Sequence, residues 1–398
     1  MKINYYQSGK LYLSSSANPL LDLTQNYQGP VYAYHLGGIL DRWNQYRTAL
    51  DGTRAFYAVK ANSNREILRN LFRSGCGADV VSGGELARAI ECGCAPQSIL
   101  FSGVGKTKEE IRQALDQGIK QLNVESYPEL QRILELMRAT GKQIGISLRF
   151  NPDIDVQTHP YISTGLKDNK FGMDEQELRE SLNLLKSQKI ALSGLSMHLG
   201  SQIKDLGALE EGAQSLFKKF KEIRNEHPSL KHLDLGGGLG IDYEVDHDDQ
   251  EIARLANWGK TVRKLFFESG VANEIEISTE PGRFLVARFG VLIAQVQYIK
   301  RTQHKVFVIL DTGMTHLIRP ALYSARHRIL PLKLNASEQI TCDVVGPICE
   351  SSDCFGQDYQ LTSLAADDFV AIVDAGAYGY SMASEYNLQK LPQEICLS

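Results

Sequence analysis

The sequence lacks long apolar runs and has no concentration of positive charge. No stretch approaches the ~20 consecutive apolar residues that a membrane-spanning helix needs. Residues 1–16 also lack the apolar core of a signal peptide. The formal net charge is −4, without a run of lysine and arginine, so binding to nucleic acid is not expected. These absences predict a cytoplasmic protein that binds neither membranes nor nucleic acids.

Cysteines and histidines are few and widely scattered. The seven cysteines are odd in number within a chain of 398 residues, which does not favour a disulfide framework. Cys92 and Cys94 form a lone C-x-C without a second pair, and the histidines lack zinc-type spacing. We therefore expect no structural metal site.

What the sequence does contain is one repeated pattern between residues 55 and 283. A short apolar run ends in small or polar residues, and a helical stretch such as 107–118 follows it. Alternating strands and helices imply a parallel sheet, and eight such units favour a closed (β/α)8 barrel of the α/β class. The eight runs are 56–62, 77–85, 99–103, 121–126, 144–151, 195–201, 233–238 and 275–283.

The pattern changes after Arg283. Runs such as 291–300 and 369–378 look like strands separated by turns, and the opening segment of the chain also looks like β-structure. The predicted domains are a barrel at 36–282 and a mainly antiparallel β domain formed by 1–35 with 283–398.

Polar residues stand at the ends of the predicted barrel strands, where barrel enzymes carry their chemistry. In "AFYAVKANSN", Lys60 ends a buried strand. It either reaches solvent or is desolvated in the barrel mouth, where its amine could form a Schiff base. The other polar or glycine features at strand ends are Ser82, His198, Ser201, Gly236–Gly238 and Glu280.

Each of these features has two interpretations. The glycines of "LDLGGGLGID" either form a tight turn or let backbone N–H groups approach a phosphate. Glu280 and Arg283 either form a structural ion pair or hold a pyridinium nitrogen and an anion. His198 is either structural or stacks on a ring. Taken together, they indicate a site for pyridoxal phosphate, with Lys60 as the Schiff-base lysine.

Eight motifs occur in order along nearly the whole chain: "YAVKAN", "GADVVSGGEL", "HLGSQI", "LDLGGGLGI", "EPGRF", "LIRPALY", "CESSDCFG" and "DAGAYGYSM". Together they resemble the diaminopimelate decarboxylases, a family of alanine-racemase-like (fold type III) pyridoxal phosphate enzymes. Residues 151–172 are also similar to the family's barrel sequence. The resemblance implies decarboxylation of meso-diaminopimelate to L-lysine and carbon dioxide, the last step of lysine biosynthesis.

The resemblance also implies residue roles. Lys60 and Cys349 would be catalytic, with Cys349 as proton donor. Cys349 and Glu350 would reach the site from the other subunit of a homodimer. The residues that it assigns to the cofactor are Lys60, His198, Ser201, Gly236, Gly237, Gly238, Glu280, Gly282, Arg283 and Tyr378. Those that it assigns to the substrate are Arg283, Arg319, Tyr323, Glu350 and Tyr378.

Without the resemblance, two of these residues are ambiguous. A cysteine in "VVGPIC" is more often a buried structural thiol than a catalytic one, whereas the adjacent Glu350 and the "SSD" that follows favour a location at the rim of the site. Arg319 is equally compatible with a surface arginine, and because it precedes a proline we expect it in an extended turn.

Departures from the family pattern leave other functions open. Thr312, His316, the basic segment 323–329 and the tail 387–395 differ from it near the expected substrate end. They favour, as the first alternative, a paralogous decarboxylase for another carboxylate-bearing amino acid, such as a siderophore or polyamine precursor. A second alternative is a racemase of the same fold, which needs a second base opposite Lys60. Cys349 could serve as that base, but "CESSD" and the length of the chain fit a decarboxylase better. A third alternative is a non-catalytic regulatory homologue, which would typically lose the lysine or the proton donor. It is disfavoured because Lys60, Glu280 and Cys349 are all present. A nicotinamide enzyme is disfavoured because the glycine motif is incomplete.

Overall fold

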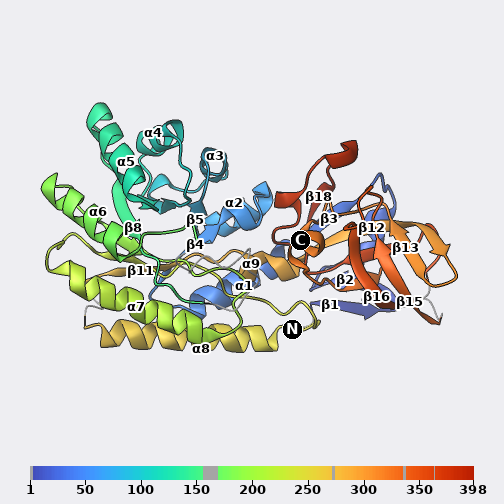
Figure 1. Ribbon diagram of the computed structural model, residues 1–398. Coiled ribbons are helices and arrows are strands. Elements are labelled where there is room, and N and C mark those ends of the chain that lie inside the picture. The colour runs from blue at the N-terminus through green and yellow to red at the C-terminus, as the bar shows by residue number, and fades with distance from the viewer. Residues whose placement is uncertain (1–2, 156–168, 271–273, 335–337, 363) are drawn as a thin grey trace. The chain divides into compact units, whose positions relative to one another are not determined.

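A computed structural model describes residues 3–155, 169–270, 274–334, 338–362 and 364–398 (Figure 1). Most of the family-like segment 151–172 therefore lies outside the described residues. The chain divides into two compact units. The barrel unit is Trp43–Gly240 with Ile252–Gly282, and the β unit is Met1–Arg42, Ile241–Glu251 and Arg283–Ser398.

Eight parallel strands close into a barrel, which confirms the predicted (β/α)8 fold. Each strand pairs with the next one in the sequence, and the last pairs with the first. Every strand overlaps its predicted run. The strands are β4 (Arg54–Ala58), β5 (Gly77–Val80), β6 (Ile99–Phe101), β7 (Gln121–Val124), β8 (Gly145–Arg149), β9 (Gly194–Ser196), β10 (His232–Asp234) and β11 (Glu276–Thr279).

The helices α2 to α7 begin at polar caps that follow the strand ends. In α4 (Lys108–Gln117), Thr107 accepts a hydrogen bond from the backbone N–H of Glu110, and the Glu110 carboxylate accepts one in return. Gly118 ends the helix in a left-handed conformation. The other helices are α1 (Leu36–Ala49), α2 (Arg65–Arg73), α3 (Gly83–Glu91), α5 (Tyr127–Thr140), α6 (Glu175–Ser187), α7 (Leu206–Arg224) and α8 (Asp249–Glu268), with α4 at Lys108–Gln117.

The β unit contains a mixed, mostly antiparallel sheet in the order β14-β17-β12-β13-β15-β16. Strand β3 from the N-terminal segment pairs with β12, so that segment completes the sheet as predicted. The elements are β1 (Asn4–Gln7), β2 (Lys10–Leu13), β3 (Val31–His35), α9 (Arg283–Val286), β12 (Gly290–Arg301), β13 (Val306–Leu310), α10 (Arg319–Tyr323), β14 (Ile329–Pro331), β15 (Gln339–Val345), β16 (Cys354–Thr362), β17 (Phe369–Ile372) and β18 (Gln393–Leu397).

The core of the β unit follows the two-residue period of its strands. Val31 and Ala33 on β3 and Val291 and Ile293 on β12 belong to one buried apolar cluster, because alternate residues of a strand face the same side. No described helix of either unit combines the length and the apolar character that a membrane crossing needs.

Candidate active site

Lys60 is placed at the barrel mouth by the end of β4. The strand stops at Ala58, and a short 3-10 turn, η2 (Val59–Ala61), carries the lysine beyond it. The Nζ atom of Lys60 lies 3.3 Å from Oδ2 of Asp79, which is fully buried on the neighbouring strand β5. The lysine side chain is only 34% exposed. Its amine is therefore partly shielded from solvent and is held beside a buried carboxylate.

Lys60 borders a cavity of about 380 Å³ at the carboxyl ends of the strands. Residues from different strands line it, including Asn123 on β7, Arg149 on β8, His198 after β9 and Glu280 after β11. The cavity thus brings together groups that are far apart in the sequence, at the edge where barrel enzymes carry their chemistry.

Three carboxyl groups of the barrel unit, those of Asp79, Asp234 and Glu280, are buried and repel one another. Burial, followed by the charges of Asp234 and Asp79, raises the pKa of Glu280 well above its usual value. Burial also raises the pKa of Asp234 to about 6. A cation beside Glu280 would relieve this repulsion and favour the ionised carboxylate.

His198 is held as a neutral imidazole. Its Nδ1 atom accepts a hydrogen bond of 3.1 Å from the backbone N–H of Gly237, so the proton of the neutral ring is on Nε2. Burial, followed by the charges of Lys60 and Arg149, lowers the pKa of His198 well below its usual value. A neutral, oriented ring at a cavity wall is suited to stacking on an aromatic ligand.

The glycine run after β10 brings backbone close to His198 and Glu280. Gly236 and Gly238 have φ angles of +67° and +115°, which side-chain-bearing residues rarely adopt. A Cβ on Gly237 would collide with the carbonyl oxygen of Glu280, and one on Gly238 would lie 2.6 Å from that of Gly200. Glycine is required here for close packing of backbone segments, next to Ser201.

Arg149 is fixed by a buried chain of charges. Its guanidinium donates to Oε1 of Glu125 at 2.7 Å and to the carbonyl of His198 at 3.2 Å. Glu125 also accepts from the backbone N–H of Gly103 at 3.0 Å. Nearby, the buried Nζ of Lys106 donates to Glu129 at 2.7 Å. These residues were not among those predicted from the sequence.

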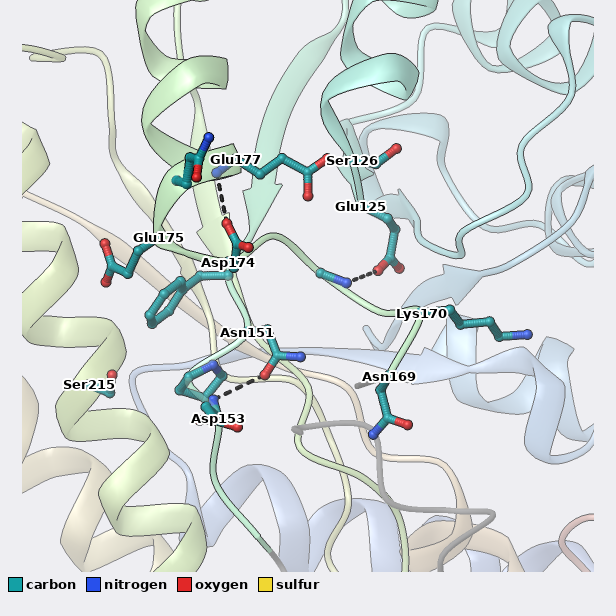
Figure 2. Close-up of a pocket in the computed structure, with 14 residues that line it drawn as sticks. Glu125, Ser126, Asn151, Asp153, Asn169, Lys170, Asp174, Glu175, Glu177 and Ser215 are labelled. Carbon is teal, nitrogen blue, oxygen red and sulfur yellow. Dashed lines mark hydrogen bonds between the residues drawn. The ribbon is translucent and has the colours of Figure 1, made fainter. Parts of the chain in front are cut away.

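A second cavity of the barrel unit, of about 820 Å³, is surrounded by acidic side chains (Figure 2). Glu125 borders it and accepts a hydrogen bond of 3.0 Å from the backbone N–H of Gly172. Asp174 uses its carboxylate to cap α6 through the N–H of Glu177. Within the described ranges, no group of three or more histidine, cysteine, aspartate or glutamate side chains is arranged to hold a metal ion.

In the β unit, Arg283 lies at the centre of an aromatic cluster. Its guanidinium donates to the hydroxyl of Tyr243 at 2.7 Å and lies 4.8 Å from the ring centre of Tyr378. The guanidinium of Arg319 lies 4.5 Å from the ring centre of Tyr243. Electrostatic contact between the two arginines makes this cluster a site of concentrated positive charge.

The structure corrects one expectation for Arg319 and decides between two others. Arg319 is 4% exposed, which excludes the interpretation as a surface arginine. It begins the short helix α10 instead of lying in an extended turn, because proline is tolerated in the first turn of a helix, where its missing N–H is not needed. Tyr323 ends the same helix, so α10 carries both residues.

Cys349 and Glu350 lie on a loop of the β unit that Asp353 anchors. The Asp353 carboxylate accepts hydrogen bonds from the backbone N–H groups of Met314 at 2.6 Å and Ile348 at 2.7 Å. Both Cys349 and Glu350 are exposed, so the interpretation of Cys349 as a buried thiol is wrong.

Two of the departures from the family pattern pair with each other. The Oγ1 atom of Thr312 lies 3.0 Å from Nδ1 of His316, and both side chains are buried. The backbone carbonyl of His316 accepts a hydrogen bond of 2.8 Å from the Tyr32 hydroxyl. The two buried side chains thus hydrogen-bond to each other inside the β unit.

The sequence carried a signal for two site residues that it did not assign. Asp79 and Asp234 each interrupt an apolar strand run, "GADVV" and "LDL", and a carboxylate inside a buried strand requires a partner. Tyr243 and His327 gave no such signal, because only the folded β unit brings them to Arg319.

Comparison with known proteins places this site in a defined class. A family described as "Pyridoxal-dependent decarboxylase, pyridoxal binding domain" matches residues 36–287, more than half of the chain. The expected fold type III decarboxylase that depends on pyridoxal phosphate and acts on an amino acid is thereby confirmed.

Individual relatives narrow the class. The chain is 37% identical to diaminopimelate decarboxylase of Aquifex aeolicus (strain VF5), over 98% of this chain and 91% of that protein. It is 42% identical to the enzyme of Helicobacter pylori (strain J99), over 94% and 92%. A crystal structure of the Helicobacter pylori enzyme complexed with L-lysine matches with a TM-score of 0.89 and 41% identity, over 95% and 94% of the two chains. The chain therefore belongs to the diaminopimelate decarboxylase family.

The residues of the barrel unit fit pyridoxal phosphate. Lys60 offers an amine at the cavity wall, and Glu280 has a raised pKa that a protonated ring nitrogen would offset. The glycine run packs its backbone closely against the carbonyls of Glu280 and Gly200, beside His198. The amine and the carboxylate thus match two chemical parts of the cofactor.

Proposed function

We propose that this protein decarboxylates meso-diaminopimelate to L-lysine and carbon dioxide, the last step of lysine biosynthesis. The observation that carries the proposal is the shared cavity of Lys60, His198 and Glu280, in which the amine, the neutral ring and the carboxylate match the cofactor. Relatives that match nearly the whole chain are named diaminopimelate decarboxylase, which supports meso-diaminopimelate as the substrate.

Pyridoxal phosphate, when bound, supplies an electron sink for the pair of electrons that the departing carbon dioxide leaves behind. In our proposal Lys60 holds the cofactor through its amine, and Glu280 keeps the ring nitrogen protonated. His198 presents its neutral ring to one face. The residues proposed to bind the remaining parts of the cofactor are Ser201, Gly236, Gly237, Gly238, Gly282, Arg283 and Tyr378.

Substrate contacts are proposed for the β unit. Arg283 and Arg319 would bind a carboxylate, since a guanidinium offers two parallel donors to it. Tyr323 and Tyr378 would flank the substrate, and Glu350 would bind its distal ammonium group. Cys349 would deliver a proton to the carbon that has lost its carboxylate. Both Cys349 and Glu350 are exposed, which is compatible with contact with a neighbouring subunit.

We further propose a homodimer in which Cys349 and Glu350 complete the site of the partner chain. The domain boundaries that accompany this proposal are 36–282 for the cofactor-binding barrel and 1–35 with 283–398 for the β domain, and the family match at 36–287 supports the first of these. The cytoplasmic location stays a prediction from the sequence.

The test is a substrate panel with the purified protein and pyridoxal phosphate. Carbon dioxide release is measured with meso-diaminopimelate, L-ornithine and L-arginine, beside the Lys60→Ala variant. We expect release from meso-diaminopimelate, with L-lysine formed in equal amount, and none from the variant. Release only from another amino acid would contradict the proposed substrate and support the paralogous decarboxylase.

A further inference from the structure

His327 is buried against Arg319 in the β unit. One Arg319 guanidinium nitrogen lies 2.7 Å from Nε2 of His327, and Nδ1 of His327 lies 2.9 Å from the carbonyl oxygen of Val373. The exposed fractions are 2% for His327 and 4% for Arg319. The imidazole therefore links the guanidinium directly to a backbone carbonyl.

The chemistry of the two partners fixes the tautomer of His327. A guanidinium can only donate hydrogen bonds, so Nε2 must accept, and Nδ1 must carry the proton that reaches the Val373 carbonyl. Burial, followed by the charge of Arg319, lowers the pKa of His327 to about 3. The ring is therefore a neutral acceptor at physiological pH.

This arrangement orients Arg319 without neutralising it. Its contacts are the acceptor nitrogen of His327 and the ring face of Tyr243, which itself packs edge-on against His327 at 5.1 Å between ring centres. Within the part of the chain that the structure describes, no carboxylate pairs with Arg319. A buried guanidinium normally has an anionic partner, and the carboxylate of a bound substrate can supply one.

We propose that His327 is a positioning residue, which aims the Arg319 guanidinium at the distal carboxylate of the substrate and, because it is uncharged, leaves the full positive charge for that carboxylate. The inference rests on the proposed function. The preference for a substrate with a distal carboxylate then depends on His327 being uncharged. An acidic residue in its place would hold Arg319 equally well but would compete with the substrate carboxylate for the guanidinium.

The test compares three substitutions at this position in the holoenzyme. His327→Gln keeps a neutral acceptor, His327→Glu provides a charged one, and His327→Phe provides none. The measurements are kcat and KM for meso-diaminopimelate, and inhibition by L-lysine and by 1,5-diaminopentane, which is lysine without its carboxylate. The ratio of the two inhibition constants reports the contact with that carboxylate.

We expect His327→Glu and His327→Phe to raise KM and weaken inhibition by lysine about 10-fold or more, the loss typical of a charge-assisted hydrogen bond. Inhibition by the diamine should change little, and His327→Gln should stay close to the unsubstituted enzyme. The matched control is His232→Phe. His232 is also buried, and its ring nitrogens lie 3.0 Å from Gln121 and 2.7 Å from Ser278, so this variant should lose stability but keep the inhibition ratio.

Three results would overturn the role of His327. An unchanged ratio in His327→Glu would show that the charge of the acceptor is irrelevant. Equal losses in His327→Gln and His327→Glu would show a packing role only. If the unsubstituted enzyme forms no lysine from meso-diaminopimelate, the proposed function fails, and this role fails with it.

Discussion

The ammonium group of Lys60 lies 3.3 Å from the buried carboxylate of Asp79, across the paired strands β4 and β5. The contact answers why a core strand ends on a lysine: the next strand supplies a carboxylate that holds the amine at the barrel mouth. The same carboxylate contributes to the raised pKa of Glu280, so it acts on both ends of the proposed cofactor site.

Replacing Asp79 by asparagine should therefore slow cofactor binding. The variant keeps the shape but loses the charge that holds Lys60, and we expect kcat/KM to fall about 10-fold, as for a lost charge-assisted bond. The measurement is the rate of the absorbance change when pyridoxal phosphate is added, followed by kcat/KM. Asp116→Asn is the control, because the Asp116–Lys142 pair is exposed; equal effects in both variants would refute a specific role for Asp79.

Substitution of Gly237 by alanine should reduce affinity for pyridoxal phosphate. The added methyl group would collide with the carbonyl of Glu280 and displace backbone beside His198, which its N–H group orients. Equilibrium titration with the cofactor checks this. Gly84→Ala in α3 is the matched control, since its methyl group would meet only Ser82 Oγ, at 3.8 Å. Unchanged affinity in Gly237→Ala would contradict a close approach of backbone and cofactor.

Tyr386 should support substrate binding through Glu350. Its hydroxyl donates a hydrogen bond of 2.8 Å to the Glu350 carboxylate, and the neighbouring Asn387 accepts one of 3.3 Å from the N–H of Cys349. Tyr386→Phe should raise KM for meso-diaminopimelate a few-fold, with a smaller change in kcat. The exposed Tyr298 gives the control, Tyr298→Phe. A fall in kcat alone would point to Cys349 as the residue that Tyr386 supports.

The buried His232 should make stability depend on pH. Burial lowers its pKa to about 4, whereas the unfolded chain has the ordinary value of about 6.5. Between these values the unfolded state binds more protons, so His232 costs stability as the pH falls. Relative to His232→Gln, the free energy of unfolding should fall by about 1 kcal/mol per pH unit below 6.5. Denaturant titrations from pH 7 to pH 5 check this; a constant difference would contradict a neutral buried ring.

The barrel could be predicted from the sequence because its signals are local. Each strand is a short apolar run, and each helix carries its own cap, as Thr107 and Glu110 do for α4. Side chains at strand ends were located by topology alone, which is why Lys60, His198 and Glu280 were identified together. The pattern also indicated the β unit, since strand runs need no long-range information.

Contacts made only by the tertiary fold were not predictable. His327 lies in a segment noticed only for its basic character, and its bond to Arg319 and Val373 depends on the folded β unit. Arg319 was expected in an extended turn because a residue before proline locally prefers extended backbone. In the folded β unit Arg319 instead begins the helix α10. Thr312 and His316 were noticed only as departures near the expected substrate end, and their contact with each other was not predicted.

The most direct test of the central claim is to locate the cofactor on the chain. The protein is incubated with pyridoxal phosphate, reduced with borohydride, digested and analysed by mass spectrometry. We expect one cofactor-derived mass increase, on the peptide that contains Lys60, and none in Lys60→Ala. An increase on a different lysine, or an equal increase in the variant, would contradict it.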